Sequence, residues 1–247
     1  MNLKLKNKVC FVSGSSRGIG FAIGKKLIDE GAIVIFNSRS KSPMKKIQFL
    51  KNADFISADV SSLEDCSKIT TYIQKKYKKI DILVCNVGSG SSVPPGNENY
   101  SEWLRMFNSN FYSSVNLIEA LSKIISNNGA ILCISSICAL KVTGAPVTYS
   151  VAKSALNAFV KNIAPFFAKR DIRINAIALG NILHNNSVWK KKLNSDRANV
   201  LKFLKDNVSL QRLGKPEEVA NFSAFILSPL AKFATGSIYT FDGGQVL

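Results

Sequence analysis

The sequence predicts an α/β protein built on one doubly wound parallel sheet of about seven strands, with helices on both faces. Two observations point to this class. Short runs of Val, Ile, Leu and Phe alternate along the chain with longer segments whose apolar residues recur at helical spacing. Strands made of continuous apolar residues are typical of parallel sheets that are covered on both sides. The 247 residues contain no linker, composition break or repeat, so a single domain over residues 1–247 is expected.

In the N-terminal half, apolar runs predict strands over residues 9–12, 33–36, 54–58 and 81–85. Helical spacing predicts helices over residues 18–30, 43–51 and 62–78, the second being the weakest. Gly31 follows the first helix, at a position where glycine commonly ends helices. Glu64 and Asp65 stand in the first turn of the third helix, where the helix dipole favours acidic side chains.

In the C-terminal half, strands are predicted over residues 129–134, 173–179 and 237–241. Helices are predicted over residues 101–126 and 146–169, followed by a polar insert with a further helix. Pro216 is expected at the first position of the last helix, with Glu217 and Glu218 behind it. The order of elements therefore alternates strand and helix from end to end.

The charge is unusual, because 33 Lys and Arg against 16 Asp and Glu give a net charge of +17. Such a balance raises the possibility of nucleic-acid or membrane-surface binding. The lysines are spread in pairs and triplets along the whole chain, however, and no arm or Arg-rich block concentrates them. A composition spread over solvated faces is the preferred interpretation, with attraction of an anionic substrate or carrier as a further option. No nucleic-acid or membrane partner is expected.

The chemistry of Cys and His excludes other classes. The five cysteines have no paired spacing, which argues against a disulfide framework. His184 is the only histidine, so a metal site of Cys and His or a Ser-His-Asp hydrolase is not expected. The sequence has no run of about 18 apolar residues, and its first residues lack the apolar core of a signal peptide. We therefore expect a reduced, cytoplasmic protein.

A glycine-rich turn lies between the first predicted strand and helix. Gly14, Gly18 and Gly20 give the spacing G-x-x-x-G-x-G within residues 13–20. Such a turn lets the backbone approach a pyrophosphate, whose charge then meets the helix N-terminus. A plain connecting turn is the alternative, but the strand–turn–helix context favours a dinucleotide site.

The end of the second strand bears on the choice of coenzyme. A carboxylate there would bind the ribose 2′-hydroxyl of NAD, whereas Arg accommodates a 2′-phosphate. The sequence offers Arg39 and no acid, with Arg17 as a second possible cationic contact. This favours NADP(H) over NAD(H), unless Arg39 is only a solvated loop residue. Asp59, after the third strand, is expected either to accept from the adenine amino group or to cap the following helix.

Tyr149 and Lys153 are four residues apart in a predicted helix, which places both side chains on one face. A Lys ammonium near a phenol lowers its pKa from about 10, so that Tyr can act as a general acid or base. Alone, such a pair is usually a surface coincidence. Ser136 favours a functional interpretation of the pair, because it ends the fifth strand at the edge where these sheets bind ligands. Its hydroxyl is expected to bond a substrate carbonyl oxygen.

These features resemble the short-chain dehydrogenase/reductases over essentially the full chain, and the overall resemblance is similarly close to 3-oxoacyl-(acyl-carrier-protein) reductases. Residues 13–20 are similar to the family's Thr-Gly-x-x-x-Gly-x-Gly, with Ser for Thr. Residues 85–88 are similar to its Asn-Asn-Ala-Gly, residues 175–180 to its Asn-x-x-x-Pro-Gly, and residues 242–244 to its Asp-Gly-Gly. Asn110, Ser136, Tyr149 and Lys153 match its catalytic positions. The resemblance implies a Rossmann-type fold and a homotetramer or homodimer.

The resemblance also implies a mechanism. Hydride passes between the nicotinamide and a carbonyl carbon, and Tyr149 donates the proton to the carbonyl oxygen. Lys153 binds the nicotinamide ribose and lowers the Tyr149 pKa, Ser136 polarises the carbonyl, and Asn110 holds a water that connects Lys153 to solvent. The expected cofactor site consists of Gly14, Ser16, Arg17, Gly18, Ile19, Gly20, Ser38, Arg39, Asp59, Val60, Asn86, Val87, Gly88, Tyr149, Lys153 and Ile182. No metal is expected.

Four departures from the family pattern occur near the cofactor. Val87 replaces a small Ala, Cys85 replaces an Asn, and Leu179 replaces the Pro before Gly180. The Thr that often follows this turn and bonds the carboxamide is missing from residues 181–184. They affect cofactor affinity and coenzyme preference rather than the reaction type, because no catalytic group is lost.

Substrate choice is expected from a lid around residues 183–210 and from the loop at 88–96. The lid contains Asn185, Asn186, Trp189 and Lys190 to Lys192. Polar groups in both segments suit a sugar, sugar nucleotide or polyol, or else reflect solvent exposure alone. A 3-oxoacyl thioester is the first substrate hypothesis, and basic residues near the mouth would then dock its acidic carrier: Arg105, Lys169, Arg170 and Arg173. A non-catalytic cofactor-binding subunit and a nucleic-acid-binding protein are the remaining alternatives.

Overall fold

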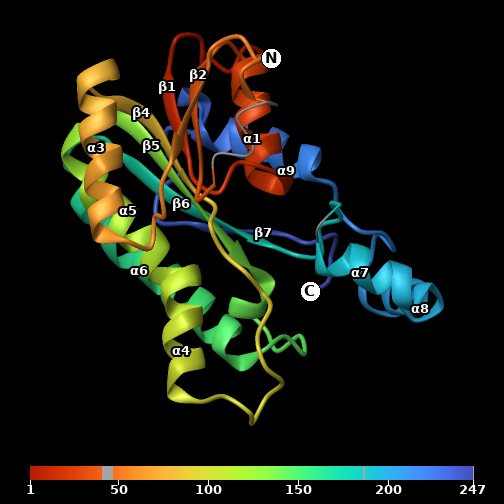
Figure 1. Cartoon of the computed structure of the whole chain (residues 1–247). Helices are drawn as coiled ribbons and strands as arrows, with labels where there is room; N and C mark the ends of the chain where they lie inside the picture. Colours follow the sequence, from red (N-terminus) through yellow and green to blue (C-terminus); the bar gives the residue numbers. More distant parts are fainter. Residues whose placement is uncertain (41–46, 186, 247) are drawn as a thin grey trace.

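The chain folds around a seven-stranded parallel sheet, as predicted (Figure 1). A computed structural model describes residues 1–40, 47–185 and 187–246. The strand order is β3-β2-β1-β4-β5-β6-β7, and all neighbouring strands are parallel. The strands are β1 (Val9–Val12), β2 (Ile33–Ser38), β3 (Ala53–Ser57), β4 (Ile80–Cys85), β5 (Ile125–Ser136), β6 (Arg173–Leu179) and β7 (Ile238–Phe241). The order reverses between β1 and β4, which sets the ligand-binding crevice of a doubly wound sheet at that point.

Helices cover both faces of the sheet (Figure 1). On one face lie α1 (Gly18–Asp29) and α9 (Pro216–Leu227), whose buried side chains share a core with β1, β2 and β5. On the other face lie α3 (Leu63–Tyr77), α5 (Ser113–Leu121) and α6 (Val147–Ala168), which bury a second core against the same sheet. Most strands are apolar on both sides because both faces are covered. Of the helix predicted over residues 43–51, residues 43–46 lie outside the described residues, and residues 48–51 form turns and a bend, so the prediction is wrong for this part.

The long helix predicted over residues 101–126 is wrong in part. The structure divides this segment into α4 (Tyr100–Phe107), a π-helical turn at Asn108–Tyr112, α5 and a 3₁₀ turn at Ser122–Ile124. Asn110 lies in the π turn, and its side-chain amide donates to the carbonyl oxygen of Met106 at 3.0 Å. This side-chain bond accompanies the local widening, and π turns often occur at functional sites.

Strand β5 begins four residues earlier than the predicted start at Gly129. Its first residue, Ile125, pairs with Ile80 of β4, and the register of the two strands then shifts before Ile82. Asn128 adopts a φ of +63°, which makes the strand irregular at this point. Residues 126–128 are polar, so a run of apolar residues does not predict this part of the strand.

The polar insert after β6 forms two helices, α7 (Val188–Ser195) and α8 (Arg197–Asn207), which extend away from the sheet (Figure 1). Ser187 and Asp196 cap them by accepting from backbone N–H groups. A small apolar cluster holds the pair to the following loop: Val200, Leu204, Val208 and Leu213. The excursion falls within the segment predicted to act as a substrate lid. Within the described ranges, no helix has the length and apolarity needed to cross a membrane.

Candidate active site

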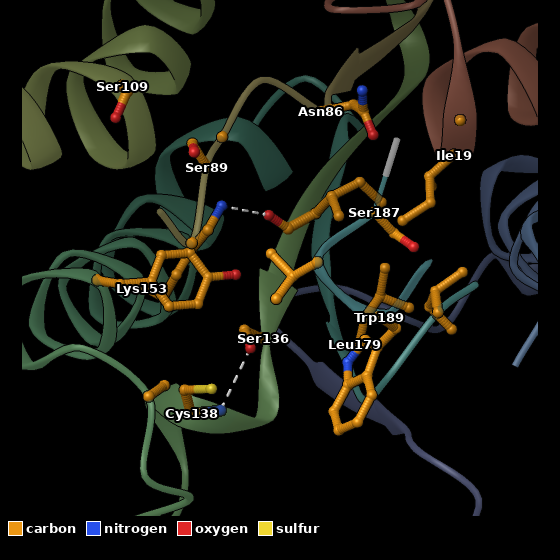
Figure 2. Close-up of a pocket in the computed structure, with 18 of the residues that line it drawn as sticks. Ile19, Asn86, Ser89, Ser109, Ser136, Cys138, Lys153, Leu179, Ser187 and Trp189 are labelled. Atoms are coloured by element: carbon orange, nitrogen blue, oxygen red, sulfur yellow. Dashed lines mark hydrogen bonds between the residues drawn. The ribbon is translucent and has the colours of Figure 1, made fainter. Parts of the chain in front are cut away.

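A cavity of about 1260 Å³ opens at the carboxyl ends of the central strands. Its wall is made by the loops after the first six strands, β1 to β6, together with parts of α7 and α8. Figure 2 shows Ser136 and Lys153 on one side of this space and Ser187 and Trp189 on the other. The cavity therefore lies at the edge predicted to bind ligands.

The turn between β1 and α1 presents an uncapped helix N-terminus to the cavity. Arg17 is the N-cap residue, but its side chain makes no capping bond, and the first turn of α1 has no acidic residue. Gly14 and Gly18 both have a φ of +58°, a conformation that other residues rarely adopt. Both glycines line the cavity. This arrangement fits a phosphate group, because free backbone N–H groups and the helix dipole both favour an anion there.

Two asparagines fix the shape of this turn. Asn86, just after β4, donates from its side-chain amide to the carbonyl oxygens of Ser13 and Gly14, at 3.2 and 3.0 Å. Asn37, buried in β2, accepts from the Gly14 N–H at 3.3 Å and donates to the Ala58 carbonyl at 3.1 Å. Asn37 is absent from the predicted site. The sequence signal for it is a polar residue inside a buried apolar strand, which must find hydrogen-bond partners.

The predicted coenzyme-selecting residues lie at one end of the cavity. Ser38 ends β2 and Arg39 follows it, and both line the cavity. The Arg39 backbone is held by its carbonyl oxygen, which accepts from the Ser57 hydroxyl at 2.9 Å. Its side chain is exposed and forms no salt bridge within the described part of the chain. A free guanidinium at this position fits a 2′-phosphate.

Asp59 also lines the cavity, and one of its two predicted roles is wrong. Ser62, not Asp59, caps α3 by accepting from the Asp65 N–H. The Asp59 carboxylate instead accepts from the backbone and hydroxyl of Ser61, at 3.0 and 2.7 Å. Because Ser62 caps the helix, Asp59 remains on the cavity wall. Its other predicted role, accepting from the adenine amino group, stays a prediction.

Ser136, Tyr149 and Lys153 meet on one wall of the cavity, as predicted. Ser136 is the last residue of β5, and its hydroxyl oxygen accepts from the Cys138 N–H at 3.3 Å (Figure 2). Tyr149 and Lys153 lie one turn apart on α6. The Lys153 side chain is buried, and its Nζ donates to the Ile134 carbonyl oxygen at 2.8 Å (Figure 2).

Asn110 is fully buried directly behind this wall. Its Oδ1 accepts from the Ser89 N–H at 2.9 Å. A Cβ built on Gly88 would lie 2.8 Å from Asn110 Oδ1 and 3.1 Å from Lys153 Nζ. Both side chains therefore converge on Gly88, where only a glycine leaves room for them, and Asn110 lies beside Lys153 as expected.

The electrostatics of the pair differ from the prediction. Burial raises the pKa of Tyr149 to about 12, while hydrogen bonding to Ser136 acts in the opposite direction. Burial lowers the pKa of Lys153 to about 8. The Lys153 ammonium donates to the Ile134 carbonyl, and it does not contribute to the pKa of the phenol. The predicted lowering of the Tyr149 pKa by Lys153 is thus not present in this side-chain arrangement.

Nearly all predicted site residues line the cavity. The exceptions are Asn110, described above, and Gly20. Gly20 is buried against the phosphate turn, and a Cβ there would lie 2.5 Å from the Asn86 side-chain amide. Gly20 therefore supports the turn by permitting close packing rather than by facing the ligand space.

The insert contributes an aromatic and cationic wall. Trp189 stacks on Phe203 with ring centroids 5.3 Å apart, and Lys192 places its Nζ 4.8 Å from the Trp189 ring. All three residues line the cavity, as does His184. Asn186 lies outside the described residues. Cys138 and Thr143 also line the cavity, and the prediction missed them because nothing in the sequence marks the loop after β5 as a wall.

Three of the four basic residues predicted near the mouth lie elsewhere. Lys169 and Arg170 follow α6 and Arg173 begins β6, so all three are at the amino edge of the sheet, opposite the cavity. Arg173 is buried and donates to the Ala234 carbonyl oxygen. Arg105 alone lines the cavity, in an ion pair with Glu102 at 2.6 Å. Parallel strands explain the error, because residues that start a strand cannot reach the edge where the strand ends.

Comparison with known proteins gives matches over the whole chain. The family profile described as Enoyl-(Acyl carrier protein) reductase matches residues 14–245. A 3alpha-hydroxysteroid dehydrogenase of Mediterraneibacter gnavus is 32% identical, with 98% of both chains covered. A 3-oxoacyl-(acyl-carrier-protein) reductase of Buchnera aphidicola is 33% identical, with 99% of this chain and 100% of the relative covered. The structure of L-sorbose reductase from Gluconobacter frateurii, complexed with NADPH and L-sorbose, superposes with a TM-score of 0.94 at 28% identity, covering 100% of this chain and 99% of that one.

Proposed function

We propose that this chain, which belongs to the short-chain dehydrogenase/reductase family, is an NADP(H)-dependent carbonyl reductase or alcohol dehydrogenase. The single observation that carries this proposal is the cavity that brings Ser136, Tyr149 and Lys153 together beside the glycine-rich turn. Neighbouring structures at 28% and 26% identity are described as NADPH complexes, which supports the coenzyme.

The residues present fit a dinucleotide. The uncapped N-terminus of α1 would receive the pyrophosphate, and the exposed Arg39 would receive the 2′-phosphate. Asn86 and Gly88 line the space between that turn and the catalytic wall. The bound cofactor supplies the hydride for carbonyl reduction. The protein itself holds the substrate, excludes water and transfers one proton.

Tyr149 is the proposed proton donor. Its pKa of about 12 keeps the phenol protonated at neutral pH, so the proton is in place, and proton transfer to a carbonyl oxygen would require a neighbouring positive charge to bring that pKa down. Ser136 would bond the same oxygen and stabilise its developing negative charge. Lys153 would turn from the Ile134 carbonyl toward the nicotinamide ribose and the phenolate that remains, with Asn110 behind it supporting a path for proton return. A nearby ammonium favours the phenolate and so lowers the cost of releasing the proton.

Coenzyme preference gives a first prediction. The Arg39→Asp variant should shift the ratio of NADPH to NADH dissociation constants by about 10- to 100-fold toward NADH. The change removes a cation from the 2′-phosphate and adds a carboxylate suited to a ribose 2′-hydroxyl. The ratio is measured by titrating both coenzymes against quenching of the protein's Trp fluorescence.

Arg197→Asp is the matched control, because it makes the same charge change on α8 and lies outside the cavity lining. It should leave the ratio unchanged. If Arg39→Asp left the ratio of NADPH to NADH dissociation constants unchanged, the proposal that Arg39 selects NADP(H) by its charge would be contradicted.

For the substrate, we infer a 3-oxoacyl thioester. Its support is the 33% identity to a 3-oxoacyl-(acyl-carrier-protein) reductase and the presence of Lys192 among the residues that line the cavity. A sugar or sugar nucleotide is the second candidate. It is favoured by the superposition on a sorbose reductase and by polar side chains such as Asn181, Ser195 and Asn199 in the cavity.

The two candidates separate in one assay. NADPH consumption is followed with a panel of 3-oxoacyl thioesters and a panel of keto-sugars and keto-sugar nucleotides. Turnover of the thioesters supports the first proposal, and turnover of the sugars alone replaces it with the second.

Self-association is proposed through α4, α5 and α6, in line with the homotetramer or homodimer that the resemblance implies. Tyr112, in the π turn just before α5, and Phe166, on α6, are large side chains that remain 43% and 58% exposed. Exposed apolar side chains of this size are common at protein interfaces. Light scattering with Phe166→Glu tests it: the wild type should be a dimer or tetramer and the variant smaller.

A further inference from the structure

His184 lies directly on the phosphate-binding turn. The positions of its ring atoms Cε1, Nδ1 and Nε2 are 3.2, 3.3 and 3.3 Å from the place that a Cβ on Gly18 would occupy. The imidazole therefore packs against the first residue of α1, at the mouth of the uncapped helix. Ser187 fixes the backbone below it, donating to the His184 carbonyl at 2.8 Å and accepting from the His184 N–H at 3.2 Å.

The imidazole of His184 is without a hydrogen-bond partner among the described residues. Neither ring nitrogen makes a hydrogen bond or ion pair within residues 1–40, 47–185 and 187–246. The charged group that acts on its pKa is Arg17, on the same turn; Lys192, Asp59 and Asp196 are the other nearby charged residues that line the cavity with it. Burial first, and then the Arg17 charge, lower the pKa of His184 below its usual value. A partly buried imidazole, a guanidinium and a helix N-terminus therefore lie together on the glycine-rich turn, and each can donate hydrogen bonds to an anion.

We propose that His184 binds the pyrophosphate of the bound dinucleotide, together with Arg17 and the N-terminus of α1, and makes coenzyme affinity depend on pH. This proposal rests on the NADP(H)-dependent function proposed above. The ligand chemistry is a diphosphate diester, which carries two negative charges at all pH values near neutrality. An imidazolium donates charge-assisted hydrogen bonds to such oxygens, whereas a neutral imidazole donates one weaker bond.

The sign of the pH effect follows from the charges. In the free protein, burial and Arg17 favour the neutral imidazole. Two phosphate charges reverse that balance, so the imidazole takes up a proton when the coenzyme binds. Affinity is then highest below the pKa of His184 in the free protein, which lies under the ordinary value, and falls as the pH rises from there through the higher pKa of the complex.

The test is NADPH binding to wild type and His184→Gln between about pH 5.5 and about pH 8.5. Gln keeps a hydrogen-bonding side chain of similar size but cannot gain charge. The wild-type dissociation constant should rise about tenfold more over this range than that of the variant. Calorimetry in two buffers with different ionisation enthalpies should show proton uptake by the wild type that the variant lacks.

Two controls isolate the pyrophosphate. Adenosine 2′-monophosphate carries the titrating 2′-phosphate but no pyrophosphate, so its binding should have the same pH dependence in both proteins. Lys192→Gln removes a cation that lines the same cavity and should leave the pH dependence of NADPH binding intact. Parallel pH curves for wild type and His184→Gln would overturn the inference while leaving the coenzyme assignment in place. Failure of the wild type to bind NADPH at any pH would overturn both.

Discussion

Replacing Tyr149 with Phe is expected to reduce kcat for carbonyl reduction at least about a thousandfold and to change the NADPH dissociation constant less than about threefold. The substitution removes the hydroxyl of the proposed proton donor at the cavity wall and leaves Ser136 and Lys153 in place. The loss belongs to the chemical step, because the coenzyme contacts proposed at Arg17 and Arg39 remain. Steady-state kinetics and a fluorescence titration give the two quantities.

Two further variants sharpen this test. Ser136→Ala should cost about a hundredfold in kcat, since it removes one donor to the carbonyl oxygen and leaves the acid in place. Tyr112→Phe is the matched control, because it makes the same change at a half-exposed residue outside the cavity lining. It should leave kcat unchanged. Turnover by Tyr149→Phe within tenfold of the wild type would contradict the assignment of the proton donor.

The second large effect is expected from the charge on Lys153. With a pKa of about 8, the buried ammonium loses its proton just above neutral pH, whereas Tyr149, at about 12, keeps its own. The value of kcat/KM for NADPH should therefore fall about tenfold per pH unit above about pH 8. The decline reports Lys153 in the free enzyme, because binding and phenolate stabilisation both use its charge.

Lys153→Arg separates this titration from other causes, since a guanidinium keeps its charge throughout the range. Its activity should be lower than that of the wild type but should not decline near pH 8. The free energy of unfolding gives an independent readout. The folded-state pKa of Lys153 is depressed, so the unfolded chain binds more protons and wild-type stability should rise with pH between about 8 and 10.5. Lys153→Met should lack that rise. The role given to this lysine would be contradicted if kcat/KM of Lys153→Arg declined near pH 8 as in the wild type and the stability of Lys153→Met rose with pH as in the wild type.

Sequence periodicity predicts the sheet well because its strands are continuous apolar runs. The predicted and observed bounds agree for β1 and β6, and they differ by one or two residues for most other elements. The segment around Asn110 could not be predicted, because a π turn depends on where a buried side chain finds its partners and not on apolar spacing. The early start of β5 is hidden for a related reason: its first residues are polar and irregular.

In the candidate site, too, features set by local sequence could be predicted and features set by tertiary contacts could not. Residues within local motifs, such as Tyr149 and Lys153, are placed correctly because a helix fixes their relative positions. The direction of the Lys153 ammonium, toward Ile134, depends on burial and tertiary contacts that no motif contains. Arg170 and Arg173 were misplaced because linear closeness to a functional strand does not show which end of it they occupy. The role proposed for His184 depends on its contact with Gly18, which is more than 160 residues away in sequence and which no local motif predicts.

The most direct test of the central claim is to follow deuterium from C4-deuterated NADPH into the product alcohol by mass spectrometry, using the thioester and keto-sugar panels. One deuterium is expected on the carbinol carbon of at least one product with the wild type, and the rate of transfer is expected to be at least about a thousandfold lower with Tyr149→Phe. Deuterium transfer by Tyr149→Phe at the wild-type rate, or tight NADPH binding without transfer to any carbonyl in either panel, would contradict the central claim.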